Sequence, residues 1–377
     1  MPCVADVIAF LERFAPLELA EEWDNVGLLV GDNRREVRSV MTCLTLTPEV
    51  AREAIERQAG LIVTHHPVLF RAVKRLTAAD SEGRMLLDLI AAGVAIYSPH
   101  TAYDSAEDGI NEQLARLFGL TEIEPLRRMP AAGRCKIVCF VPRSHLAEVQ
   151  RALWSAGAGV IGEYSKCSFV VDGAGSFEGS AAANPSVGQA ERLESVDEAR
   201  LEVVCPEQQI AKAVRCLKEA HPYEEPAIDV YPLKASQSRR GAGRTGVLAG
   251  KIAEAGAASR PMPLSDFLET VKVKFSISHL PYVGDLTRPI SRVAIACGSG
   301  GEFLSAAIEK QCDVLVTGEA RFHTCLAARG AGMGLVLAGH YATERPALEY
   351  LAGILAREFP DLAIRASQAE RDPVQWN

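Results

Sequence analysis

The sequence alternates short apolar segments with helix-forming segments, and this alternation restricts the possible fold more than any other feature. In the first part of the chain, residues 37–46, 61–64 and 94–97 have the apolar composition of buried strands. Residues 81–92 and 108–118 have helical patterns between and after them. Consecutive strand–helix–strand units require a largely parallel sheet covered by helices. The sequence therefore predicts an α/β fold with a parallel or mixed sheet.

The same alternation returns after residue 290. The strands expected there are residues 293–296, 314–317 and 335–338, and the helices are residues 302–310, 321–329 and 347–358. Two α/β halves thus flank a middle region of different pattern. A length of 377 residues also favours two domains over one. We expect one discontinuous α/β domain made of residues 1–131 and 237–377.

The middle region has the order strand–helix–strand, repeated once. Its expected strands are residues 136–141, 168–171, 200–205 and 227–231, and its expected helices are residues 144–156 and 207–220. This order is typical of a ferredoxin-like α+β domain. We therefore expect residues 132–236 to form an inserted domain. The polar, Gly/Arg-rich residues 234–246 are interpreted as a linker.

Composition excludes several classes of function. The net charge is −8, and no basic stripe with interleaved aromatic residues is present, which argues against a nucleic-acid surface. Residues 1–14 have the pattern of an amphipathic helix carrying Asp6 and Glu12, unlike a signal peptide. No apolar run approaches the ~20 residues that span a bilayer. We expect a cytoplasmic protein without membrane or nucleic-acid partners.

The ten cysteines do not indicate disulfides or a cysteine metal site. Cys43, Cys139, Cys205 and Cys297 lie in apolar, strand-like segments, and no C-x-x-C pair occurs. Thiols in such segments are usually buried and reduced. We expect that state here.

The histidines are the main functional signal. Four of the eight, His65, His66, His100 and His340, lie just beyond the carboxyl ends of predicted strands, where ligands collect in open α/β sheets. Adjacent strand residues point to opposite faces, so His65 and His66 can share a site only if the strand ends before them. Pro67 favours that ending because it biases the preceding residue away from helix.

Carboxylates accompany these histidines. Asp104 follows His100 by four residues, and Glu344 follows His340 by four, a spacing that places two helical side chains on one face. Three imidazoles and two carboxylates exceed the needs of one tetrahedral zinc and suit a pair of metal ions ~3.5–4 Å apart. Zinc, iron or manganese fits this donor set better than copper(I) or an iron–sulfur cluster. The alternative is that these histidines are ordinary hydrogen-bonded loop residues. The predicted ligands are His65, His66, Asp104, His340 and Glu344.

Other residues near these segments have weaker signals. We interpret His100 as an outer partner of the metal site or a proton shuttle, with a simple polar loop as the alternative. His323 follows another strand and could face the site or lie on a helix surface, and the sequence does not decide between them. Gly298–Gly301 could bind a phosphate, but a tight turn is favoured because the full glycine fingerprint is missing.

Two further features are better explained by structure than by function, and one type of active site is not supported. Arg71 and Lys74 could attract an anionic substrate, but a solvated surface is favoured. The segment 221–226 contains a histidine and two glutamates between prolines, and we interpret it as a rigid turn and not as a second metal site. No Ser-His-Asp arrangement with strand–turn–helix context is present.

Several motifs resemble the Nif-three-like dinuclear-metal family, whose members are also labelled GTP cyclohydrolase 1 type 2 homologs. They are Glu22-Trp23-Asp24-Asn25-Val26-Gly27-Leu28, Thr64-His65-His66-Pro67, His100-Thr101 with Asp104, and Gly339-His340-Tyr341-x-Thr343-Glu344. The resemblance extends from residue 4 to about 358. In the middle region, Gly162-Glu163-Tyr164, Cys167-Ser168-Phe169 and residues 220–226 resemble the PII/CutA-type insertion of the longer members.

The resemblance implies a set of expectations. The family's five metal ligands carry over to the five residues predicted above, and its assembly implies a ring-shaped homohexamer (toroid). Tyr103 departs from the family pattern before the ligand Asp104, which affects local packing. The family label implies a metal-dependent hydrolase acting on a nucleotide through a metal-activated water, as in the hydrolytic ring opening of GTP. The alternatives are a phosphoesterase with the same site and a non-enzymatic metal-binding regulatory or scaffold ring.

Overall fold

The computed structural model describes residues 1–129, 133–234, 239–249 and 261–375. The chain divides into two compact units, one made of residues 1–129 and 239–377 and the other of residues 130–238. The expected domain boundaries, at 131/132 and 236/237, fall on residues outside the described ranges. The assignment of the second unit as an inserted PII/CutA-like domain stays a prediction.

The larger unit contains two sheets. The first has the order β1-β4-β3-β2-β17, in which β4, β3, β2 and β17 run parallel and β1 is antiparallel. Its strands are β1 (Gly27–Val30), β2 (Ser39–Cys43), β3 (Leu61–Thr64), β4 (Ala95–Ser98) and β17 (Ala363–Ala366). Strands β2, β3 and β4 carry apolar side chains on both faces, as expected for a sheet that is covered on both sides.

The second sheet of this unit has the order β12-β16-β15-β14-β10-β5. Its parallel centre is formed by β14, β15 and β16, and antiparallel strands flank it on both sides. The strands are β5 (Leu120–Arg128), β10 (Gly241–Leu248), β12 (Tyr282–Val283), β14 (Arg292–Ala296), β15 (Val314–Thr317) and β16 (Gly334–Leu337). A small ladder pairs β11 (Met262–Pro263) with β13 (Pro289–Ile290). The predicted α/β class with mixed sheets is confirmed.

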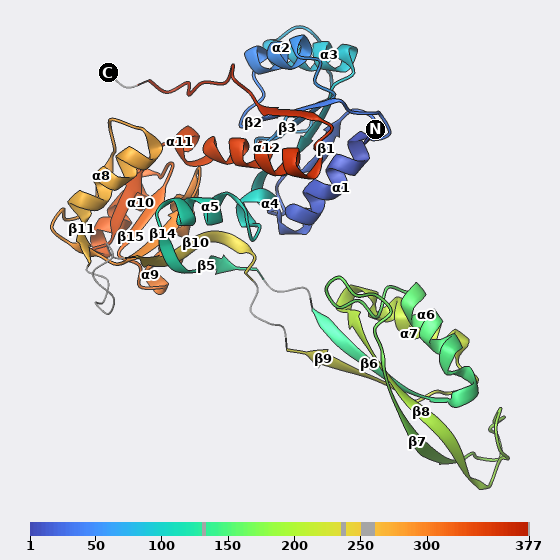
Figure 1. Cartoon of the computed structure of the whole chain (residues 1–377). Coiled ribbons are helices and arrows are strands. Elements are labelled where there is room, and N and C mark those ends of the chain that lie inside the picture. Colours follow the sequence, from blue (N-terminus) through green and yellow to red (C-terminus); the bar gives the residue numbers. More distant parts are fainter. Residues whose placement is uncertain (130–132, 235–238, 250–260, 376–377) are drawn as a thin grey trace. The chain divides into compact units, whose positions relative to one another are not determined.

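Helices cover both sheets (Figure 1). In the larger unit they are α1 (Val4–Phe14), α2 (Pro48–Glu56), α3 (Ser81–Ala92), α4 (His100–Ser105), α5 (Ile110–Leu117), α8 (Leu264–Phe275), α9 (Leu304–Glu309), α10 (Phe322–Gly330), α11 (His340–Glu344) and α12 (Pro346–Glu358), with 3₁₀ turns η1 (Leu17–Leu19) and η4 (Gly300–Phe303). Helix α2 begins at Pro48 because the Thr47 side chain accepts a hydrogen bond from the Val50 amide and proline is favoured in the first turn.

A single apolar core joins the two sheets of the larger unit. It contains Val63 and Tyr97 from the first sheet, Ile295 and Val316 from the second, and Leu351 of α12 between them. The opposite face of the first sheet packs on α2 and α3, and the opposite face of the second packs on α9 and α10. Because the core is shared, the carboxyl ends of β3 and β4 are held at a fixed distance from those of β14 and β16.

The second unit has its own sheet and core. Its elements are β6 (Arg134–Pro142), η2 (Arg143–His145), α6 (Leu146–Ser155), β7 (Phe169–Glu178), β8 (Leu193–Pro206), η3 (Glu207–Gln209), α7 (Ile210–Ala220) and β9 (Ile228–Leu233). The antiparallel sheet has the order β7-β8-β6-β9, and both helices pack on one face through an apolar cluster. The predicted strand–helix–strand order therefore holds for the described part of this unit, with a longer β7–β8 hairpin than expected.

One expectation was wrong, and two elements had not been predicted. Residues 241–246, interpreted as linker, belong to β10, while residues 235–238 of the same segment lie outside the described part of the chain. Strand β5 and helix α8 were not expected at all. The glycines and the arginine of β10 are typical of a polar loop. In the structure, however, Arg244 is fully buried. Its guanidinium donates hydrogen bonds to the Glu112 carboxylate and to the backbone carbonyls of Gly241, Gly243 and Ala106.

Within the described ranges, no helix has the length and apolar character needed to cross a bilayer.

Candidate metal centre

The paired histidines follow β3 directly. Strand β3 ends at Thr64, and the His65 and His66 amides then donate to the carbonyls of Cys43 and Leu44. Ser98 at the end of β4 donates its hydroxyl to the His65 carbonyl at 2.7 Å. These bonds hold the chain as it leaves the sheet. Both imidazoles can then face one space, as the sequence predicted.

His340 and Glu344 come from the second sheet. Gly339, with φ of +93°, turns the chain from β16 into the short helix α11 that both residues occupy. Their spacing brings His340 Nε2 within 3.0 Å of Glu344 Oε2. Gly298, after β14, has φ of +57°, and a Cβ at this position would lie 2.1 Å from Glu344 Oε1. Glycine at position 298 therefore leaves room for the Glu344 carboxylate.

Asp104 lies on α4, one turn after His100. Its Oδ1 accepts a hydrogen bond from the Cys297 thiol at 3.3 Å, and its backbone carbonyl accepts one from the Asn111 side chain at 3.1 Å. Asn111 also binds the Cys297 amide at 2.8 Å. These hydrogen bonds connect α4, which follows β4 of the first sheet, to the end of β14 in the second sheet. Asp104 is thereby positioned by residues far away in the sequence.

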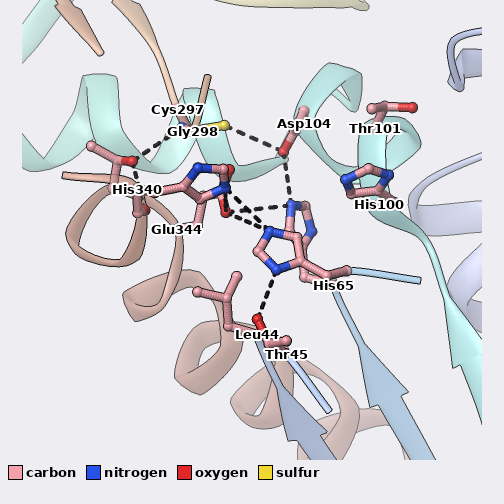
Figure 2. A network of polar contacts seen from close by, with 12 residues as sticks. Leu44, Thr45, His65, His100, Thr101, Asp104, Cys297, Gly298, His340 and Glu344 are labelled. Carbon is pink, nitrogen blue, oxygen red and sulfur yellow. Dashed lines mark hydrogen bonds and ion pairs between the residues drawn. The ribbon is translucent and has the colours of Figure 1, made fainter. Parts of the chain in front are cut away.

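These side chains converge on one space (Figure 2). Glu344 Oε2 lies 3.0 Å from His66 Nε2 and 4.0 Å from His65 Nε2. His65 Nε2 lies 3.6 Å from Asp104 Oδ1, and the Nε2 atoms of His66 and His340 are 3.3 Å apart. The structure thus brings together all five residues that the sequence predicted as ligands. In two groups of three, His65 with His66 and His100, and His66 with His340 and Glu344, the donor atoms lie within 4.8 Å of one another.

His100 is next to this cluster and is held by Asp24. His100 Nδ1 lies 2.7 Å from Asp24 Oδ1, and Thr101 binds the other carboxylate oxygen through its amide and hydroxyl. The Asp24 carboxylate is fully buried. Burial alone would raise its pKa, but the bonds from His100 and Thr101 lower the pKa of Asp24 to about 2. Asp24 therefore stays ionised and fixes the orientation of the His100 ring.

Proton affinities in the cluster are strongly perturbed. Burial lowers the pKa of His65 well below its usual value, so the ring is neutral. The hydrogen bond with Glu344 raises the pKa of His340 to about 9. Burial and the Glu344 carboxylate raise the pKa of Asp104 to about 7. Burial would also raise the pKa of Glu344, but the bonds from His340 and His66 lower it below its usual value.

The residues present fit a metal ion. Both ring nitrogens of buried His65 lack a hydrogen-bond partner among the described residues, and a buried imidazole without a partner is costly. Around it, neutral imidazole nitrogens and carboxylate oxygens are gathered within a few ångströms, the donor set of zinc, iron or manganese sites. Thr45 Oγ1 lies 2.7 Å from His66 Nδ1 and fixes the ring so that Nε2 faces the cluster.

The remaining sequence candidates lie elsewhere or act structurally. His323 is exposed on α10, and Arg71 and Lys74 are exposed on the segment after β3. The Gly298 and Gly300 amides bind the hydroxyls of Thr343 and Thr317, so this segment is a tight turn. His221 binds the Phe140 carbonyl and the Tyr223 amide, as expected for a rigid turn. The described cysteines are all free thiols, and six of the ten are buried.

Sequence reasoning missed four residues that surround the cluster: Asp24, Thr45, Cys297 and Glu319. Glu319 Oε1 lies 3.3 Å from His340 Nδ1. Asp24 belongs to a motif that the sequence analysis quoted without a role, so it could have been suspected. The other three are ordinary residues at strand ends, and only the packing of the two sheets brings them to the histidines.

A cavity of about 290 Å³ opens beside the cluster. Its lining includes His66, His100 and Asp104 on one side and His340, Glu344 and Cys297 on the other. Trp23 and Phe303 also line it. An α/β protein that collects imidazoles and carboxylates from two sheets beside a cavity has the form of a histidine–carboxylate metal-binding protein.

Comparison with known proteins shows the family of this chain. The Duf34/NIF3 (NGG1p interacting factor 3) family matches residues 2–373, and the chain belongs to this family. A Listeria monocytogenes protein named GTP cyclohydrolase 1 type 2 homolog is 35% identical over 373 residues, which cover 98% of this chain and 97% of that protein. A Bacillus subtilis protein of the same name is 35% identical over 336 residues, which cover 89% and 87%.

Two solved structures extend the comparison. The Bacillus cereus protein related to NIF3 has a TM-score of 0.79 at 33% identity, covering 100% of this chain and 99% of that chain. Staphylococcus aureus protein SA1388 has a TM-score of 0.81 at 29% identity with the same coverage. The family resemblance read from the sequence motifs is therefore confirmed.

Proposed function

We propose that the protein is a metal-dependent hydrolase that acts on a nucleotide. The observation that carries this proposal is the buried His65 imidazole, whose two nitrogens have no partner among the described residues, at the centre of a cluster of imidazoles and carboxylates. The ligands proposed for two divalent ions, zinc, iron or manganese, are His65, His66, Asp104, His340 and Glu344. Divalent ions at such a site lower the pKa of a coordinated water toward ~7.

The surrounding residues have separate roles in this proposal. Asp24 holds His100 through Nδ1, which leaves Nε2 as the nitrogen that can exchange a proton with the substrate. Cys297 holds the Asp104 carboxylate by its thiol. A small molecule in the cavity that His100 lines would lie beside these groups. The name shared by the curated relatives supports a nucleotide as that molecule. Attack of water on a phosphoester would use the same residues.

The proposal is tested by metal analysis together with a substrate screen. The purified protein is expected to contain divalent metal and to turn over one member of a panel of nucleotides and phosphoesters. Glu344→Ala removes a carboxylate within 3.0 Å of two imidazoles, so metal-dependent turnover should fall by more than the 10–100-fold that loss of an outer partner costs. Glu309→Ala, an exposed glutamate on α9, is the control. Tight ligand binding without turnover would instead support a regulatory metal protein.

A second prediction concerns Thr45. Thr45→Val removes the hydroxyl that fixes the His66 ring, and metal affinity should fall about 10–100-fold, because outer partners orient the ligands. Thr45→Ser keeps the hydroxyl and should bind metal as the wild type does. The affinities are measured by competition with a chelator. Equal affinities for Thr45→Val and wild type would show that His66 needs no such partner or is no ligand.

We further propose, from the family resemblance, that the chain forms a ring-shaped homohexamer in the cytoplasm and that the second unit is a PII/CutA-like insertion. The net charge of −8 agrees with the absence of a nucleic-acid partner. Sedimentation analysis of the full chain measures the oligomeric state directly. A stable monomer would contradict the hexamer.

A further inference from the structure

An exposed aromatic pair is formed by Trp23, which lines the metal-centre cavity, and Phe70, which contacts the Trp23 ring. The Trp23 residue is 61% exposed and Phe70 is 52% exposed, although both are large and apolar. Their ring centroids are 5.9 Å apart at an interplanar angle of 74°. Both rings also contact His100 edge to face, at 6.2 Å and 6.4 Å. Trp23 lines the same cavity as His66 and Asp104. Large exposed aromatic groups beside a cavity are typical of ligand-binding surfaces.

The pair is held in place by hydrogen bonds of neighbouring residues, some of which reach helix α4. Asn25 donates its side-chain amide to the Leu69 carbonyl at 3.0 Å, which joins the segment of Trp23 to that of Phe70. Asp24 binds His100 and Thr101 of α4, and Thr101 also accepts a bond from the Glu21 amide. The rings are therefore positioned before any ligand arrives. Such preorganised aromatic rings lose little entropy when another ring stacks on them.

The charges of the cavity point to the kind of ligand. Its lining contains the carboxylates of Glu21, Asp104, Glu302 and Glu344, and no lysine or arginine is among the described residues that line it. Arg127 contacts two lining residues, lying 4.6 Å over the Phe303 ring and 3.9 Å from Glu302, but does not itself line the cavity. Lysine and arginine are the side chains that normally bind phosphate groups. The described lining offers neither of them.

The volume of the cavity also limits the kind of ligand that can enter it. About 290 Å³ lies at the lower end of the range for small-molecule sites. A heteroaromatic ring fits such a space, whereas a ring, a sugar and a chain of phosphates together need more. We propose that the Trp23 ring, which Phe70 supports edge to face, stacks on a planar nitrogen heterocycle of the substrate, and that the ring end, free of phosphate, enters the cavity. This inference rests on the proposed function and names the substrate class of that site.

The test uses three probes on the metal-loaded full chain. Guanosine carries a ring without phosphate, ribose 5-phosphate carries phosphate without a ring, and GTP carries both. Calorimetric titration is expected to detect guanosine binding and no ribose 5-phosphate binding, and GTP is expected to bind no more tightly than guanosine. Ribose 5-phosphate that binds as well as guanosine, GTP that binds more tightly, or guanosine that does not bind would each overturn the proposal.

Variants locate the binding surface. Trp23→Ala should raise the Kd for guanosine about 10-fold, the usual cost of removing one stacking ring, and Trp23→Phe should restore most of the affinity. Phe169→Ala removes an aromatic ring that is 62% exposed on β7 and should leave the Kd unchanged. Metal content equal to wild type shows that Trp23→Ala is folded. An unchanged Kd for Trp23→Ala would overturn the proposal.

Two further measurements separate this inference from other outcomes. Loss of guanosine binding in Trp23→Ala together with no turnover of any nucleotide would contradict the hydrolase while supporting the stacking surface. Guanosine turnover that Trp23→Ala leaves unchanged would contradict the stacking surface alone. Sedimentation of the same variant tests whether a second copy of the chain covers the aromatic pair. A changed oligomeric state would overturn the proposal.

Discussion

Metal affinity should increase about 10³-fold between pH 6 and pH 8. In the metal-free protein, Asp104 has a pKa of about 7 and His340 a pKa of about 9, and a metal ion can bind only their deprotonated forms. Both groups are deprotonated together in about one molecule in 10⁴ at pH 6 and about one in 10 at pH 8. Titration with Mn²⁺ at both pH values measures the increase.

Metal affinity rises with pH because the pKa values of both Asp104 and His340 are raised. Each pKa is raised, so each group keeps its proton to a higher pH than usual, and that proton competes with the metal. His65 adds no competition because burial lowers its pKa. Proton release should be about two per binding event at pH 6 and about one at pH 8. If Asp104 and His340 had their ordinary pKa values, the metal affinity would rise less than about 10-fold between pH 6 and pH 8. A rise of that size would contradict this account of the cluster.

Replacement of Arg244 should produce the largest loss of stability. The fully buried guanidinium donates to the Glu112 carboxylate at 2.7 Å and to three backbone carbonyls of β10 and the segment after α4. Arg244→Ala leaves Oε2 of the buried Glu112 carboxylate and those carbonyls without their donor, while Oε1 of Glu112 keeps its bond from Arg116. Removing one partner of a buried ion pair costs about 3–5 kcal/mol. We expect that loss in the free energy of unfolding, with faster amide exchange in α5 and β10.

Two further variants serve as controls for the stability loss in Arg244→Ala. Arg34→Ala removes an exposed arginine paired with Asp32 and should leave the free energy of unfolding nearly unchanged. In the double variant Arg244→Met with Glu112→Leu, neither charge is buried alone, so part of the loss should be recovered. Amide hydrogen exchange followed by mass spectrometry reports on α5 and β10 separately from the second unit. An exchange pattern equal to that of wild type in Arg244→Ala would show that the pair contributes little.

The same arginine shows why part of the fold could not be predicted. Residues 241–246 contain three glycines and one arginine and have no strand periodicity, so propensity favours a linker. They form the strand β10 because the neighbours β5 and β14 supply hydrogen bonds on both sides and Glu112 neutralises the arginine. Strands such as 61–64 and 314–317 were predicted because their own apolar, β-branched residues require burial on both faces.

For the candidate site, the sequence by itself determined the kinds of donor group and their local spacing. The end of β3 before the paired histidines, and the one-turn separation of His340 and Glu344, follow from short-range backbone geometry that a sequence pattern records. The tertiary structure alone decided that Cys297 holds Asp104, that Thr45 orients His66, and that Trp23 stands at the cavity. The first two contacts join residues that are 193 and 21 positions apart in the sequence, and Trp23 meets the other lining residues only around the cavity. The distances between these side chains depend on how the two sheets pack on one shared core.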